Sequence, residues 1–98
     1  MEKYLLLWEF DQTKIPVGPK ERRVGFNMLM KVIKQDIKKG ILKDWGLFVG
    51  ENHGYSVVQG TEVEVIKAVQ QYTPFVYFAS HPIATVNQAG EMIKVLTK

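Results

Sequence analysis

The chain has 98 residues, a formal net charge of +3 and 46% hydrophobic side chains, which predicts one globular domain over residues 1–98. It contains no cysteine, which excludes disulfides, thiol catalysis and Cys-based zinc sites and favours a reducing, cytoplasmic setting. The first apolar run, Tyr4 to Trp8, is too short for a signal peptide, and no apolar segment is long enough to span a bilayer.

The segment Lys3–Asp11, KYLLLWEFD, is predicted to be the first strand, because it is apolar and aromatic and lacks Gly and Pro. Period-two alternation gives it two faces. Both are apolar over most of the strand, which predicts a central strand that is covered on both sides. One face carries Tyr4, Leu6, Trp8 and Phe10, and the other carries Leu5, Leu7 and Glu9.

A helix is predicted from Lys20 to Lys39, after a Pro- and Gly-containing loop and before Gly40, a favourable C-cap. Its apolar stripe is predicted to face the core and comprises Phe26, Leu29, Met30, Ile33 and Ile37.

The positive charge of the chain is concentrated between Lys14 and Lys43, where nine basic residues accompany two acids. Five of the basic residues form one stripe of the predicted helix that contains no acid: Lys20, Arg23, Lys31, Lys34 and Lys38. Such a stripe could dock nucleic acid or another anionic partner, but a solvated face is the commoner reason for it. We therefore expect neither nucleic-acid nor membrane binding.

The second strand is predicted over Ile41–Gly50, with Trp45, Leu47 and Val49 on one face. A turn at residues 51–54 then leads into a third, antiparallel strand, Tyr55–Gln59.

A capping box of Thr61 and Glu64 predicts the start of a second helix. This helix runs to about Tyr72, and its inward residues are expected to be Val65, Ile66, Val69 and Tyr72. The fourth strand is predicted over Phe75–His81 and ends at Pro82. A last helix, Gln88–Leu96, is expected with Asn87 as its N-cap.

This order of elements predicts an α+β fold, the ferredoxin-like βαββαβ plait with a short C-terminal helix. Right-handed crossovers place both main helices on one face of a four-stranded antiparallel sheet, with the first and third strands in the middle. The other face would be open in a monomer although it is apolar, so its simplest cover is a second copy and a homodimer is expected. The aromatic set Tyr4, Leu6, Trp8 and Phe10 is the favoured interface.

The succession KYLLLWEFD, basic helix, WGLFVGENHGYSVVQGT, short helix and QYTPFVYFASHPI resembles the dimeric α+β barrel superfamily. Within it, the chain looks most like small proteins grouped with muconolactone-isomerase-like domains. The resemblance implies a ferredoxin-like fold and a homodimer, and an isomerase or monooxygenase-type activity is possible on the same ground. No catalytic motif of the superfamily matches this chain residue by residue.

Ionisable and hydroxyl groups interrupt the apolar first and fourth strands near their ends, among them Glu9, His81 and Tyr77. They are the candidates for acid, base and hydroxyl donor, and with Trp8 they are the predicted ligand-binding residues near the exits of the first and fourth strands. Each also has an ordinary structural explanation, as a polar strand end or a core aromatic. His53 and His81 lack the spacing of a metal pair, so no metal or cofactor is expected.

RNA-recognition domains share the plait, and His53-Gly54-Tyr55-Ser56-Val57-Val58 partly fits the motif of their third strand. Val57 replaces the second stacking aromatic, which makes RNA binding the weaker hypothesis. The favoured hypothesis is a homodimer that binds a small apolar or aromatic molecule in a cleft beside the sheet. The alternatives are an enzyme of the kind that the resemblance implies and an oligomerisation protein without a ligand.

Overall fold

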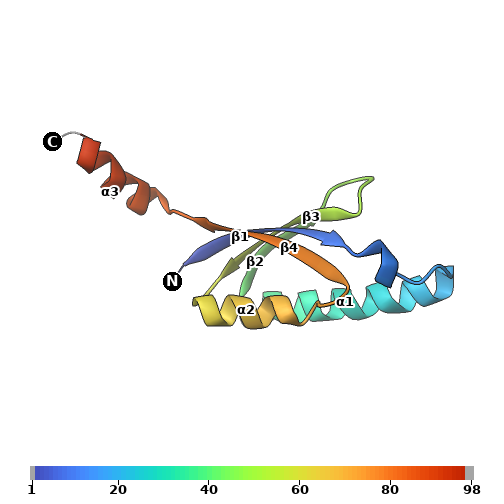
Figure 1. The fold of residues 1–98 in the computed structure, drawn as a ribbon. Helices are drawn as coiled ribbons and strands as arrows, with labels where there is room; N and C mark the ends of the chain where they lie inside the picture. Colours follow the sequence, from blue (N-terminus) through green and yellow to red (C-terminus); the bar gives the residue numbers. More distant parts are fainter. Residues whose placement is uncertain (1, 97–98) are drawn as a thin grey trace.

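The computed structural model describes residues 2–96, and four strands form one antiparallel sheet in the order β2-β3-β1-β4 (Figure 1). The chain is therefore α+β, with its first and third strands in the middle of the sheet as predicted. In chain order the elements are β1 (Lys3–Phe10), the short 3-10 turn η1 (Gln12–Lys14), α1 (Pro19–Lys39), β2 (Leu42–Leu47), β3 (His53–Gln59), α2 (Glu62–Gln70), β4 (Val76–Ile83) and α3 (Val86–Leu96).

Helices α1 and α2 cover one face of the sheet (Figure 1). Tyr4 and Leu6 of β1 are buried on this face, in a core that also contains Ile33 of α1 and Val65 of α2. The expectation that the aromatic face of β1 forms a dimer interface is therefore wrong. The period-two alternation of a strand defines its two faces but does not indicate which face the helices cover. In this protein the helices cover the more aromatic face of β1, because that face has more apolar area to bury.

The opposite face of the sheet carries the second set of β1 side chains, and Leu7 and Glu9 are exposed there. On β3, Val57 pairs with Leu5 and Tyr55 with Leu7. The neighbouring positions on β4 are His81 opposite Leu5, Ala79 opposite Leu7 and Tyr77 opposite Glu9. We call this surface the open face.

Helix α1 begins and ends where the sequence predicts. Pro19 occupies its first turn, and Gly40 ends it with a φ of 84°, a left-handed conformation that favours glycine. Its buried side differs from the predicted stripe, because Ile37 is half exposed while the polar Asp36 is buried.

The predicted antiparallel pairing of β2 with β3 is confirmed. Strand β3 begins at His53, two residues earlier than predicted, so this histidine belongs to the strand and not to the turn. Val49 is almost fully exposed beyond the end of β2, contrary to expectation. In α2, the capping box of Thr61 and Glu64 is confirmed, whereas Ile66 is exposed and Ala68 takes the buried position.

The last strand and helix differ from the prediction at their boundaries. Strand β4 continues through Pro82 to Ile83. A proline is tolerated there because β4 is an edge strand, where a residue without an N–H need not break a ladder. Helix α3 is capped by Thr85, whose Oγ1 accepts from Gln88 N at 3.2 Å while Gln88 Oε1 accepts from Thr85 N at 2.8 Å, so the predicted cap at Asn87 is wrong.

Helix α3 stands away from the sheet, beyond the end of β4 (Figure 1). None of its residues is buried. The radius of gyration is 16.3 Å, whereas a compact chain of this length has about 13 Å. The terminal helix thus contributes no packing to the core of its own chain.

Candidate functional site

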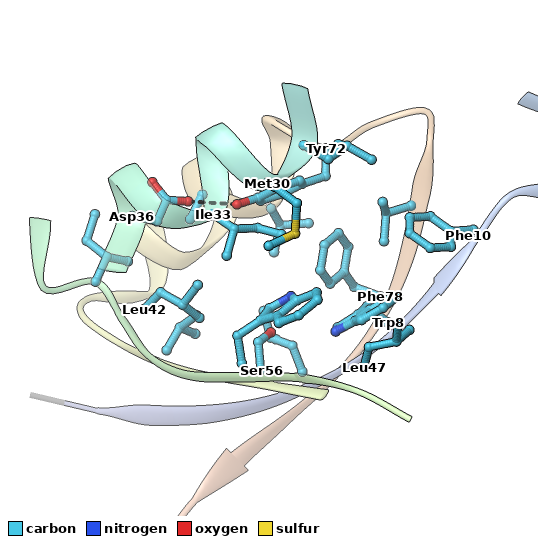
Figure 2. A pocket seen from close by; sticks show the side chains of 18 of the residues that line it. Trp8, Phe10, Met30, Ile33, Asp36, Leu42, Leu47, Ser56, Tyr72 and Phe78 are labelled. Atoms are coloured by element: carbon cyan, nitrogen blue, oxygen red, sulfur yellow. Dashed lines mark hydrogen bonds between the residues drawn. The ribbon is translucent and has the colours of Figure 1, made fainter. Parts of the chain in front are cut away.

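A cavity of about 270 Å³ lies between the sheet and the two covering helices (Figure 2). An apolar cavity of about 150 Å³ can hold benzene, so this one has room for a two-ring molecule. Its walls are almost entirely apolar and come from both layers, including Leu6, Trp8, Met30, Ile33, Tyr72 and Phe78.

Aromatic contacts fix the sheet side of the cavity. Trp8 stacks on Trp45 with ring centroids 5.4 Å apart and an interplanar angle of 10°, and Phe10 meets Trp8 edge-on at 5.2 Å. The Trp8 indole Nε1 donates to the Tyr55 carbonyl at 3.1 Å. Gly54, opposite Trp8 on β3, leaves room for this indole, since a Cβ there would lie 2.6 Å from the ring. Trp8 is thus a rigid wall of the cavity.

Asp36 supplies a polar corner between α1 and α2 (Figure 2). It is only 3% exposed, and its Oδ2 accepts from the Tyr72 hydroxyl at 3.0 Å and from Gln71 Nε2 at 3.2 Å. The pKa of the Tyr72 phenol is raised, first by burial and then by the charge of Asp36 and the hydrogen bond to it. We call these hydrogen bonds from Gln71 and Tyr72 to Asp36 the Asp36 clamp, which joins α1 to the residues that directly follow α2.

The predicted ligand-binding residues lie on opposite sides of the sheet. Trp8 lines the cavity, whereas Glu9, Tyr77 and His81 occupy the open face. The four residues therefore do not surround one common cavity. On the open face, Glu9 lies between His53 of β3 and Tyr77 of β4. His81 is four residues from Tyr77 along β4, roughly 13 Å away at the rise of a strand.

The hydroxyl of Tyr77 is hydrogen-bonded to the carboxylate of Asp11, which directly follows β1. The hydroxyl donates to Asp11 Oδ2 at 2.9 Å, and this contact raises the pKa of the Tyr77 phenol. The pKa of Asp11 is lowered, chiefly by the hydrogen bond from the Thr13 side chain and further by that from Tyr77, against an opposing effect of desolvation. The strand register thus places Glu9 between His53 and Tyr77 and leaves His81 apart. The His53 ring lies 3.3 Å from the Glu51 carboxylate.

Sequence reasoning missed Asp36 and Ser56, both of which line the cavity. Ser56 shares the inward face of β3 with Val58, so period-two alternation could have placed it inside. Asp36 adjoins the apolar stripe of α1, but its burial depends on Tyr72, a distant partner.

Within residues 2–96, no group of three or more His, Asp or Glu side chains is arranged to hold a metal ion. No helix of this described part is long and apolar enough to cross a membrane. No protein-family model matches the chain, and no curated protein matches it at a significant level.

Proposed function

We propose that this protein is a cytoplasmic, homodimeric ferredoxin-like domain of the dimeric α+β barrel kind that binds a small apolar or aromatic molecule. The observation that carries the proposal is the cavity between the sheet and the helices. Ligand sites are typically concave and apolar, with few polar groups. The cavity has these properties, with stacked aromatic rings on one side and the Asp36 clamp at one corner. The element order and the strand order β2-β3-β1-β4 support the ferredoxin-like assignment.

The binding proposal can be tested by NMR, because the chain has two tryptophans and both line the cavity. Titration with naphthalene should shift both indole N–H signals. Ala68→Leu, which adds volume at a buried wall position, should weaken binding, whereas Ala84→Leu at an exposed position should not. Retained signal dispersion in both variants would show that they fold. If neither naphthalene nor 2-naphthol shifts the indole signals, the proposal fails.

The open face and α3 support the homodimer. Four strands of six to eight residues, about 4.8 Å apart, present on the order of 450 Å² per copy, whereas a standard interface buries about 800 Å² on each partner. Helix α3 offers the additional apolar surface. At 100° per residue, all of its apolar residues except Val95 fall within an arc of about 120°: Val86, Ala89, Met92, Ile93 and Leu96. A second copy stacked on the open face is the simplest cover for both surfaces.

An enzyme is the second candidate, and the Glu9–His53–Tyr77 row favours it. Glu9 pairs with His53 across the two central strands, and a carboxylate beside an imidazole is a suitable pair for moving a proton, as an isomerisation requires. If this candidate is correct, the protein should catalyse deuterium exchange next to the carbonyl of an unsaturated lactone in D₂O, and Glu9→Gln should abolish the exchange. A Glu9→Gln variant that is as active as the wild type would exclude this role of Glu9.

A further inference from the structure

Ser56 brings a hydroxyl into the wall of the cavity. It lies on β3 opposite Leu6 of β1 and Trp45 of β2, and only 4% of its surface is exposed. Its oxygen points towards the space between the labelled cavity side chains (Figure 2).

Within residues 2–96, no hydrogen bond joins this hydroxyl to another group, although every fully enclosed side-chain nitrogen or oxygen in the same residues has a partner. The Ser56 hydroxyl therefore borders the open space of the cavity. A buried hydroxyl without a partner is unfavourable, and a ligand that supplied the partner would remove this cost.

Trp45 adds a donor beside this hydroxyl. As cross-strand neighbours, Trp45 and Ser56 have side chains that start about 5 Å apart on one face of the sheet. The indole Nε1 of Trp8 is occupied by the Tyr55 carbonyl, whereas that of Trp45 makes no hydrogen bond within the described residues. The sheet side of the cavity thus carries Ser56, whose hydroxyl has no partner among the described residues, and the lining residue Trp45, whose indole N–H has none there either.

The lining does not suit a charged ligand. Among the described residues that form the walls, none is Lys, Arg or His, and the one carboxylate, Asp36, already accepts from Tyr72 and Gln71. An anion would be buried without a cation and close to a negative charge, which is strongly unfavourable. The polar group of the ligand is therefore uncharged.

We propose that the cavity binds a neutral molecule of about two rings with one hydroxyl or carbonyl oxygen, which pairs with the Ser56 hydroxyl and accepts from the Trp45 indole N–H. This inference rests on the proposed binding function and specifies its ligand class. The apolar body of the ligand occupies the aromatic walls, and the single oxygen satisfies the hydroxyl that the protein leaves without a partner.

The test compares naphthalene, 2-naphthol and 2-naphthoate by equilibrium dialysis against the wild type, Ser56→Ala and Ser80→Ala. Ser80 is a matched control, because it pairs with Leu6 from β4 as Ser56 does from β3, but its side chain is exposed. A neutral hydrogen bond corresponds to about a three- to tenfold change in affinity. We expect 2-naphthol to bind Ser56→Ala three- to tenfold more weakly than the wild type, naphthalene to bind both equally, and 2-naphthoate to bind most weakly. Ser80→Ala should behave as the wild type.

The outcomes separate the two proposals. If naphthalene binds and Ser56→Ala leaves the affinity for 2-naphthol unchanged, the ligand class is wrong while the binding function stands. If none of the three compounds binds, the binding function itself fails. Thermal unfolding gives a second measurement, since removal of a hydroxyl without a partner should not lower Tm. A lower Tm for Ser56→Ala would show that the hydroxyl already has a partner and would overturn the inference.

Discussion

At the scale of the single residue, the buried Asp36 carboxylate accepts hydrogen bonds from Tyr72 and Gln71. Asp36→Ala would leave the Tyr72 hydroxyl buried without its acceptor, so we expect a loss of about 1–3 kcal/mol in the free energy of unfolding. Asp44→Ala is the matched control, because Asp44 accepts from the Tyr55 hydroxyl at 2.8 Å in an exposed position. It should cost less than about 0.5 kcal/mol. Urea unfolding measures both, and equal losses would contradict the role of the clamp.

The same contact has a signature at alkaline pH. The pKa of Tyr72 is raised in the folded state, so the unfolded chain releases this proton first, above the ordinary tyrosine pKa of about 10. The stability that the contact contributes is present below that pH and is lost as the pH rises through the folded-state pKa. Tyr72→Phe should therefore make unfolding less dependent on pH above about pH 10.

Two similar capping boxes allow a comparison at the scale of the element. Thr61 caps α2, which contributes Val65 and Ala68 to the buried residues, whereas Thr85 caps α3, which contributes none. Thr61→Ala should lower the free energy of unfolding by about 1 kcal/mol, the usual value of an N-cap. Thr85→Ala should fray α3 and leave the unfolding of the sheet unchanged in a monomeric background. Chemical denaturation gives the first quantity and NMR of α3 the second. A larger effect of Thr85→Ala on global unfolding would mean that α3 packs against its own chain.

The element scale also shows which helix features a local pattern can predict. The ends of α1 and the start of α2 follow from Pro19, Gly40 and the Thr61–Glu64 box, which act through their own backbone neighbourhood. The buried side of α1 does not follow in this way, since burial of Asp36 depends on Tyr72, a partner 36 residues away.

At the scale of the whole molecule, the proposed homodimer can be tested by a substitution at Leu7, which lies in the centre of the open face. Sedimentation equilibrium at micromolar concentration should show a wild-type dimer. Leu7→Lys should give a folded monomer, because an unpaired charge buried at the interface is strongly unfavourable. Met28→Lys places the same charge on an exposed position of α1 and should remain a dimer. A monomeric wild type would contradict the proposed assembly.

The sequence by itself determined the α+β class, the order of the elements and the central positions of β1 and β3. These follow from local propensity, caps and the handedness of crossovers. The predicted ligand-binding residues Glu9, Tyr77 and His81 also came from the sequence, since polar groups that interrupt apolar strands are visible in the chain itself, and Trp8 was predicted beside them.

Only the tertiary structure decided which face of β1 the helices cover, and this separated Trp8 from Glu9, Tyr77 and His81. The alternation of side chains along a strand defines two faces but does not indicate which of them is buried. That choice depends on helices that come from distant parts of the chain. The cavity and the buried Asp36 at its corner depend in the same way on how two layers from distant parts of the chain fill the space between them, which no local pattern encodes.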